Sequence, residues 1–536
     1  MKTMKTITLA ATLLFAWQGV WAEGYEPHFK KIEGNNGVEQ DGTKGHPFLI
    51  NKEQDLIDLS EDVNNGCNND KHFLLIKDLD FSKVTPEDNG NNFTPIGMGE
   101  ELGDIDCPFL GFFNGQGHTI SGINYCDEEG VGVGLFGYIY YPATISNIKL
   151  ENCSFKGSYL VGAIVGNVGD QDIDSEWGIY ECEVIGGTVE ADQYAGGIIG
   201  YSNGMTINNC TCSAEVKGDE YVGGIAGLFK GNTGDNGFSV IEDCFFTGSV
   251  SGASNTGKIA GARGGVDPTT DTEGTIKLNL YEDDSEISLS NHDRLTYYNG
   301  IENVNVTLSG RELFKDGDWN TLCLPFDLTI NGSVLNGATV KELVSSEYSK
   351  GSLTLNFTED GSNLTAIEAG KPYIIKWTGG NNLTDPVFES VTIKGTTAGD
   401  KTTDWVDFVA TYSPEAIYEN SEDKTCLYLG ADNTLYYPSS EDVKVNSFRA
   451  YFKLKNELTV GETPSEEPGN PETTSNSIKA FVLNFGDEET GIREISTPSN
   501  SSNSSNLWFT LDGRRLNGQP TQSGIFIHGS KKVILP

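Results

Sequence analysis

The hydrophobic positions between residues 134 and 265 follow a pattern that returns about every thirty residues. In each repeat an apolar segment lies between two glycines, at 134–137, 162–166, 196–200, 223–227 and 257–261. A second motif places a cysteine three residues after Ile or Leu. Its cysteines are Cys153, Cys182, Cys210 and Cys244, which are 29, 28 and 34 residues apart. Such a period predicts one supersecondary unit stacked on copies of itself, an arrangement that presents a long surface.

The repeats also predict how the stack is packed. Isoleucines of the glycine segments should lie on their equivalents one coil away, about 4.8 Å along the axis. They are Ile198, Ile199, Ile225 and Ile259. The four motif cysteines occupy equivalent positions in successive repeats, so we expect a buried row of small apolar thiols. Disulfides are the alternative in an exported chain. The extra residues of the longer intervals fall at 170–177 and 230–238, which predicts surface loops there.

The segment before the repeats predicts a helix that caps the stack. Leu56, Leu59 and Val63 share one helical face. Asn51, with Gln54 three residues later, resembles a capping box. A cap is expected because an open end would expose the apolar core and an unpaired strand edge.

The thirty-residue period is lost beyond residue 301, where apolar and polar residues alternate instead. In the run 448–454 the even-numbered residues are apolar, whereas Arg449 and Lys453 fall on the opposite face. Turn signals at 359–361 and 379–382 separate such runs. The pattern predicts an antiparallel β-sandwich over residues 301–455.

Charge and the N-terminal segment limit the partners. The chain has 36 Lys and Arg against 77 Asp and Glu, a net charge of -41, which repels phosphate backbones and anionic lipid; we expect no nucleic-acid partner. Residues 1–22 have the basic, apolar and small-residue regions of a signal peptide, and no later run is long enough for a transmembrane segment. We therefore expect a monomer exported through the Sec route, to the cell surface, the outer membrane or the medium.

An ordered series of short motifs extends over residues 40–265. It runs through His46-Pro-Phe-Leu-Ile50, Leu79-Asp-Phe81, Pro95-Ile-Gly97, the segment 109–120 and Gly134-Leu-Phe-Gly137. This series resembles the GLUG-motif surface proteins of bacteria. The resemblance implies a right-handed parallel β-helix, as on secreted adhesins and on some IgA-cleaving metalloproteases.

The C-terminal half carries two further resemblances. The stretch 319–326 and the pair 427–430 and 435–438 resemble a domain common in bacterial surface proteins. The end of the chain, with Leu511-Asp-Gly-Arg514, Gly524-Ile-Phe526 and a Lys-Lys end, is similar to C-terminal sorting signals of the type IX secretion system. The overall prediction is an all-β chain: a capped parallel β-helix, an antiparallel β-sandwich and a small β tail. Its divisions are 1–22 signal peptide, 23–130 cap and first coils, 131–265 repeats, 266–300 transition, 301–455 sandwich, 456–477 linker and 478–536 tail.

Two groups of side chains are candidates for binding. In the loop 170–177, alternate acids place several oxygens on one side, with Glu181 at the twelfth position as in a Ca²⁺ loop, although Ser175 replaces the usual glycine. Its candidate metal ligands are Asp170, Asp172, Asp174 and Glu181; a solvated acidic loop is the alternative, and we expect no other cofactor. Exposed aromatic rings are the usual platform for sugars, and Tyr140, Tyr141 and Trp177 are the candidates, Trp177 because it ends a polar insertion.

The sequence does not contain the His-Glu-x-x-His motif of zinc proteases. We therefore expect a non-enzymatic surface protein that acts in adhesion or in binding an extracellular glycan or host protein. Two alternatives stay open. A β-helix polysaccharide lyase or hydrolase would need a basic residue beside clustered carboxylates, and Arg263 is the one arginine between residues 23 and 293. A structural spacer is the other.

Overall fold

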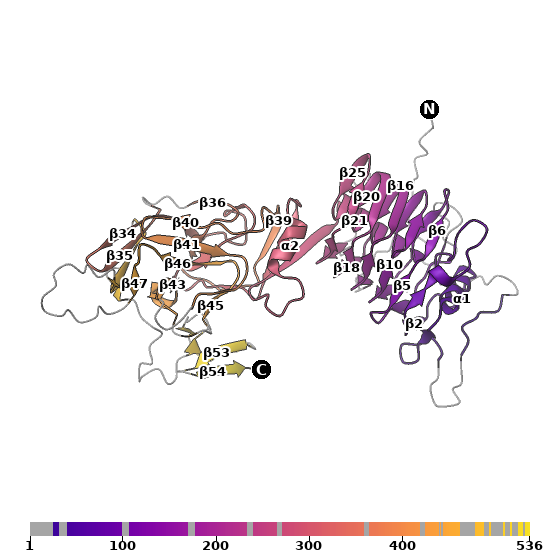
Figure 1. The fold of residues 1–536 in the computed structure, drawn as a ribbon, viewed down its shortest axis with the longest axis horizontal. Helices are drawn as coiled ribbons and strands as arrows, with labels where there is room; N and C mark the ends of the chain where they lie inside the picture. Colours follow the sequence, from indigo (N-terminus) through magenta and orange to yellow (C-terminus); the bar gives the residue numbers. More distant parts are fainter. Residues whose placement is uncertain are drawn as a thin grey trace. The chain divides into compact units, whose positions relative to one another are not determined.

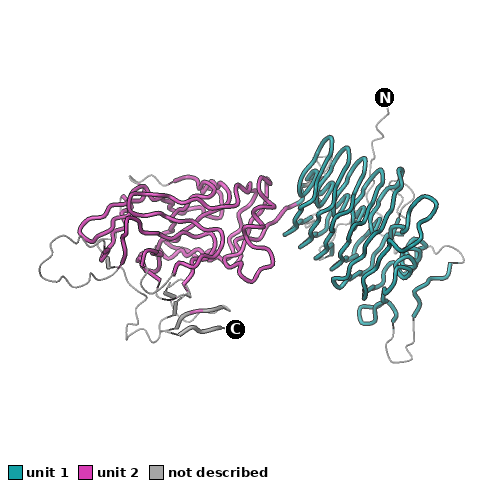
Figure 2. The backbone as a smooth tube through the Cα atoms, viewed as in Figure 1, with its two compact units in different colours: residues 1–274 teal, residues 275–536 magenta. Residues whose placement is uncertain are grey.

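The computed structural model describes most of the chain. The described residues are 25–31, 40–98, 107–169, 177–232, 239–264, 271–358, 364–418, 424–438, 440, 443–460, 477–486, 493–494, 508–509, 515–516, 524–528 and 531–535. The predicted signal peptide, residues 170–176 and most of the predicted linker 456–477 lie outside them. The described residues are mostly strands, with two α-helices, so the fold is all-β in character. The chain divides into two compact units, residues 1–274 and residues 275–536 (Figure 2).

Unit 1 is built from short parallel strands, and successive repeats supply neighbouring strands of the same sheet (Figure 1). Sheet 1 contains β1 (Phe48–Ile50), β2 (His72–Leu75), β4 (Phe112–Asn114), β9 (Thr144–Ser146), β14 (Gly178–Tyr180), β18 (Thr206–Asn208) and β22 (Val240–Glu242). Sheet 2 contains β3 (Leu79–Asp80), β5 (Thr119–Ser121), β10 (Lys149–Glu151), β15 (Glu183–Ile185), β19 (Thr211–Cys212) and β23 (Phe245–Phe246).

The second half of each repeat forms the other two sheets. Sheet 3 contains β6 (Asn124–Cys126), β7 (Val131–Val133), β11 (Ser154–Lys156), β12 (Tyr159–Gly162), β16 (Thr188–Gly196), β20 (Glu215–Gly223), β24 (Ser249–Ser251) and β25 (Ser254–Gly257). Sheet 4 contains β8 (Phe136–Ile139), β13 (Val165–Val168), β17 (Ile199–Asn203), β21 (Ala226–Asn232) and β26 (Ala260–Arg263), with β27 (Asp271–Glu273) antiparallel to β21.

The glycine segments stack in register, as the sequence predicts. Gly196 pairs with Gly223, and Gly223 with Gly257. The isoleucines between the two strands of each repeat form a continuous row, because Ile198 donates its backbone N–H to the carbonyl of Ile225, which donates in turn to Ile259. All three side chains are buried. Ile199 lies in the neighbouring row, opposite Ala226.

Two close backbone approaches explain why glycine recurs at both ends of the segment. A Cβ on the first glycine would meet a carbonyl oxygen three residues later, at 1.8 Å in the case of Gly196 and Ile199. A Cβ on the second would meet the backbone of a preceding coil, at 2.5 Å for Gly200 and the carbonyl carbon of Leu160. The strands before and after the turn therefore pack closer than any side chain would allow.

The row of thiols is buried, but its membership differs from the prediction. Cys182, Cys210 and Cys244 are at most 1% exposed and share one row, which confirms that these three stack. Ile148 fills the preceding place in that row, because Ile145 pairs with Ile179 in sheet 1. Cys153 lies one corner further on, in a row with Ile123, Gly187 and Ala214. Assigning Cys153 to the same phase was wrong.

The predicted N-terminal helix is confirmed as α1 (Glu53–Asn64), but its cap is not Asn51 with Gln54. Lys52 holds the N-cap position and makes no side-chain cap bond. Instead Asp55 accepts a hydrogen bond from the backbone N–H of Asn51, at 2.9 Å. An acid in the first turn is also favourable for the helix dipole. The opposite end of the helix holds the fully buried Asp62.

Unit 2 has no repeat, and its longest run of paired strands is antiparallel. Five of its strands form one sheet, in the order β40 (Lys401–Thr402), β41 (Val406–Thr411), β46 (Arg449–Leu454), β43 (Cys426–Leu429) and β44 (Leu435–Tyr436). In β46, Ala450, Phe452 and Leu454 are buried and Lys453 is exposed, as the alternation predicts, but Tyr451 on the opposite face is buried as well. Three pairs of described strands in this unit are parallel, which alternation alone did not predict. They are β28 (Thr275–Tyr281) with β29 (Val304–Ser309), β35 (Ser352–Phe357) with β49 (Ala480–Asn484), and β47 (Thr459–Val460) with β48 (Ser477–Ile478).

Strand β49 moves a predicted boundary. Phe481 and Leu483 are buried in the same core as Leu353 and Phe452, so residues 477–486 belong with this core and not with the tail. The prediction failed because the polar linker suggested a domain end, whereas the chain returns to the core after it. The tail strands β51 (Trp508–Phe509), β52 (Arg515–Leu516), β53 (Gly524–His528) and β54 (Lys531–Leu535) form an antiparallel sheet of four.

The sequence pattern did not predict two features of unit 2. Helix α2 (Asn291–Tyr298) begins at Ser290, whose hydroxyl accepts a hydrogen bond from the backbone N–H of Asp293. The carboxylate of Glu282 is bound by two arginines, Arg311 at 3.2 Å and Arg449 through its Nε at 2.8 Å. The side chain of Arg311 is 0% exposed, so this group is a buried charge network.

Candidate functional site

The three predicted aromatic residues lie together but do not form an exposed platform. Trp177 is 2% exposed, so the expectation of an open ring is wrong. The ring of half-buried Tyr141 meets it edge to face, with centroids 6.1 Å apart. The ring of Tyr140 covers Gly169, where a Cβ would lie 1.9 Å from it. These contacts explain the three residues as packing at one corner of the stack.

Of the predicted metal ligands, only Glu181 is among the described residues. Asp170, Asp172 and Asp174 lie outside them. Glu181 is exposed and has a positive φ of 55°, in a turn position that Asn147, Asn209 and Asp243 hold in neighbouring repeats. Asn and Asp tolerate this left-handed conformation better than Glu. Within the described part of the chain, no three His, Cys, Asp or Glu residues are arranged to hold a metal ion.

An aromatic cluster that the sequence reasoning missed lies on the surface of the repeats. Tyr194 of β16 and Tyr221 of β20 stack face to face, with centroids 4.9 Å apart and planes 10° from parallel. Tyr201 of β17 meets Tyr194 edge to face at 6.0 Å. All three side chains are partly exposed. We call this group the tyrosine cluster.

The backbone beneath the cluster is unusual. Tyr194 and Tyr221 have positive φ values of 65° and 59°, and so do their counterparts Leu160 and Asn255 in the adjoining repeats. A bulky residue in this region costs about 1–2 kcal/mol. The second glycine of each segment packs against this backbone, which fixes the conformation. Because the conformation recurs from repeat to repeat, it is a property of the fold that Tyr194 and Tyr221 share with Leu160 and Asn255.

Acidic side chains border the cluster. Burial, together with neighbouring Tyr221, Tyr201 and Glu220, raises the pKa of Tyr194 to about 12. Burial and the charge of Glu220 also raise the pKa of Tyr221. Asp192 and Asp219 are exposed one residue further out, on neighbouring strands. One cation already lies at the cluster, with the Lys230 Nζ 5.7 Å from the centre of the Tyr201 ring.

A signal for the cluster was present in the sequence. Tyr194 and Tyr221 each stand two residues before the glycine segment of their repeat, as Tyr-Ala-Gly-Gly and Tyr-Val-Gly-Gly. The left-handed residue breaks the strand alternation at this point, so alternation does not give the face that the ring occupies.

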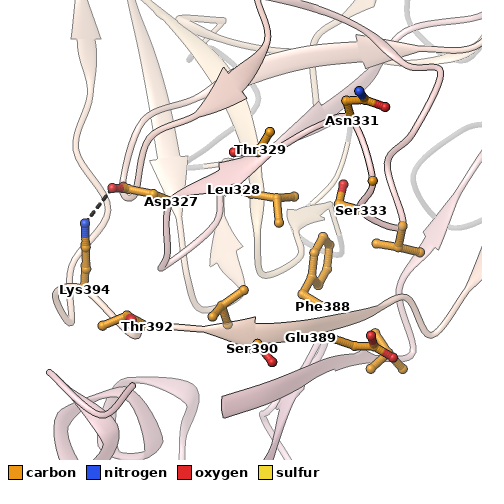
Figure 3. Close-up of a pocket in the computed structure, with 14 residues that line it drawn as sticks. Asp327, Leu328, Thr329, Asn331, Ser333, Phe388, Glu389, Ser390, Thr392 and Lys394 are labelled. Carbon is orange, nitrogen blue, oxygen red and sulfur yellow. Dashed lines mark hydrogen bonds and ion pairs between the residues drawn. The ribbon is translucent and has the colours of Figure 1, made fainter. Parts of the chain in front are cut away.

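Unit 2 has an open groove of a different kind, shown in Figure 3. It has a volume of about 800 Å³ and lies between β32 (Leu328–Thr329), with the loop that follows it, and β39 (Val387–Val391). The ion pair between Asp327 and Lys394 closes one end, with atoms 2.6 Å apart. Phe388 is 1% exposed, so the groove offers no open aromatic ring.

Arg263, the residue that lyase chemistry would need, is used in the fold. Its Nε and one terminal nitrogen donate to the carbonyl of Gly274 at 3.0 and 2.7 Å. Burial lowers the pKa of its guanidinium, which is half-buried beside β27. The described helices are too short and too polar to cross a bilayer.

Comparisons with known proteins give partial matches. No protein-family model matches the chain. Halomucin from Haloquadratum walsbyi is 30% identical over 167 residues, 31% of this chain. A "Putative Gly-rich membrane protein" from Evansella cellulosilytica is 32% identical over 131 residues, 24% of this chain. The matched segments cover 2% and 14% of these two relatives.

One solved structure is similar over part of the chain. It is described as "a putative immunoglobulin A1 protease" from Bacteroides ovatus, with a TM-score of 0.34 and 22% identity over 46% of this chain and 67% of that one. A likeness of this size carries no argument about function.

Proposed function

We propose that this chain is an exported, non-enzymatic surface protein that binds an extracellular partner through its repeat unit. The observation that carries the proposal is the tyrosine cluster. Tyr194 and Tyr221 present stacked, partly exposed rings on a left-handed backbone, whereas the ring of Trp177 is buried. Partly exposed rings of this kind are typical anchors of binding surfaces.

The architecture supports the same proposal. We propose that unit 1 is a right-handed parallel β-helix capped by α1, since its strands pair in parallel from one repeat to the next over four sheets. We propose a sandwich-like fold for the core of unit 2. Stacked repeats present equivalent positions at a regular spacing, which suits an extended partner. The names of the two relatives, one of them a membrane protein, agree with a place at the cell surface.

An array of extracellular glycans and matrix proteins tests the proposal with the full chain. We expect wild type to bind at least one class of ligand, and the variant Tyr194→Leu/Tyr221→Leu to lose that binding while keeping its melting temperature. Leucine is the matched replacement because Leu160 holds the equivalent position with the same backbone conformation. Silence of the wild type on both kinds of ligand would overturn the binding role and favour a spacer.

A further inference from the structure

We propose that the tyrosine cluster is a site for cationic side chains, and that the partner is a protein segment rich in arginine or lysine. This inference rests on the proposed binding function and names the chemistry of its partner. Aromatic faces attract cations through their quadrupole, and arginine also stacks on them.

Two exposed acids lie beside the cluster, and among the described residues no cation forms an ion pair with either of them. Asp192 and Asp219 are exposed on adjacent strands, at positions that lie side by side because Gln193 pairs with Glu220. Like charges that face each other across neighbouring strands are destabilising. A guanidinium on an outer face of the stacked Tyr194 and Tyr221 pair would bring a positive charge to the edge of unit 1 that carries these acids.

The molecule already shows the interaction at the edge of the site. The ammonium group of Lys230 lies over the Tyr201 ring at 5.7 Å. Tyr201 in turn meets Tyr194 edge to face, so the cation is part of the same aromatic group. The arrangement is a partly occupied cation site, with the Tyr194 and Tyr221 pair as its open part.

The acids favour a basic protein over a neutral sugar. A neutral sugar can donate hydroxyl hydrogen bonds to carboxylates but leaves their charge in place, whereas a guanidinium donates hydrogen bonds and also neutralises the charge. The net charge of -41 also raises the local concentration of basic partners and speeds their association. Charge and ring chemistry thus agree on the same ligand.

The experiment measures binding of an alternating Arg-Gly peptide with eight arginines to the full chain at 150 mM salt. Tyr194→Leu/Tyr221→Leu leaves the net charge unchanged, and we expect it to raise Kd about tenfold, the effect of losing one well-placed cation–aromatic contact or two exposed ones. Asp192→Asn/Asp219→Asn should raise Kd by a similar factor. Both variants are checked by circular dichroism and melting temperature.

Two matched controls lie in unit 2. Tyr437→Leu removes a tyrosine that also holds a lysine over its ring, with Lys424 Nζ at 5.2 Å from its centre. Glu389→Gln/Asp404→Asn removes two exposed acids far along the chain from the cluster. We expect neither control to change Kd by more than about twofold.

The outcomes separate this inference from the proposed function. If the controls weaken peptide binding as much as the cluster variants do, the attraction is a general effect of net charge and the cation site is wrong. If the peptide does not bind and a neutral oligosaccharide binds through Tyr194 and Tyr221, the binding function stands and the basic partner is wrong. If no array ligand and no peptide binds, both are wrong.

Discussion

The two units of the chain are stabilised by different kinds of contact. In unit 1 the same contact recurs between successive glycine segments, as where Gly196 pairs with Gly223 and Gly223 with Gly257. In unit 2 a single carboxylate, Glu282, joins groups 29 and 167 residues away. A contact that recurs in each repeat restricts which residue types can occupy the equivalent positions. A contact made once places much of the stability of its unit in a few side chains. Substitutions that act on one kind of contact and not on the other test this contrast.

The largest effect is expected from Glu282→Gln. The change keeps the shape of the side chain but removes the negative charge between Arg311 and Arg449. Breaking a buried ion pair costs about 3–5 kcal/mol. Urea unfolding, followed by hydrogen exchange in peptides of unit 2, measures the loss. The control is Asp283→Asn, whose pair with Lys444 is 37–43% exposed and is worth less than about 1 kcal/mol. Equal losses in the two variants would contradict the buried network.

In unit 1 the corresponding change is Gly227→Ala. The new Cβ would lie 2.5 Å from the carbonyl oxygen of Gly200 and 2.7 Å from the carbonyl carbon of Tyr194. Because the obstacles are backbone atoms, we expect a loss of about 3 kcal/mol, with exchange rising in the adjoining rungs as well. Gly45→Ala is the control, since nothing lies within 4 Å of its Cβ. A variant at Gly227 as stable as this control would show that the strands can separate without cost.

The buried thiols predict a smaller effect that depends on pH. Burial raises the pKa of the Cys212 thiol from its ordinary value near 9 to about 12. The folded state therefore keeps a proton that the unfolded chain loses above pH 9. Stability is full below that pH and falls as pH rises toward 12, by about 1.4 kcal/mol at pH 10 for one thiol.

The measurement compares unfolding free energies at pH 8 and pH 10. Cys212→Ala should show a smaller difference between the two pH values than wild type. Replacing the exposed Cys126 by alanine should leave the difference unchanged. The same slope in all three proteins would mean that the Cys212 thiol does not couple to folding.

The smallest effect is a gain. Glu181→Asn places in the left-handed turn the residue type that Asn147 and Asn209 already supply at the same point of their repeats. We expect about 0.5–1 kcal/mol of added stability, because Asn tolerates this backbone better than Glu. Thermal unfolding detects it as a small rise in melting temperature. A lower melting temperature would argue that the Glu181 carboxylate makes a stabilising interaction of its own.

The sequence predicted the stacking of the repeats because glycine spacing reports backbone contacts directly. It misplaced Cys153 because two similar motifs, Ile145 to Ile148 and Leu150 to Cys153, lie five residues apart in one coil. The thiol looked like the stronger match, yet Ile148 fills the same buried row as Cys182. Isoleucine and cysteine differ in size but both occupy this apolar row, so residue identity was a weaker guide than register.

The binding surface was harder to predict for a different reason. Strand alternation assigns faces only while the backbone stays extended. Tyr194 and Tyr221 have a positive φ, which interrupts the extended backbone. The two-residue alternation of side-chain direction therefore does not apply at these positions. Trp177 misled the prediction in the opposite way, because its polar neighbours suggested exposure while its ring is 2% exposed.

Differences in repeat length collect at one corner of unit 1. β13 ends at Val168 and β14 begins at Gly178, and β21 ends at Asn232 and β22 begins at Val240, whereas only Gly204 and Met205 separate β17 from β18. The paired strands on either side keep their register in all these cases. The length of the connection at this corner can therefore change without a change in strand register. A gene that encodes such repeats can lengthen or shorten one connection at a time and vary the outer surface without changing the interior.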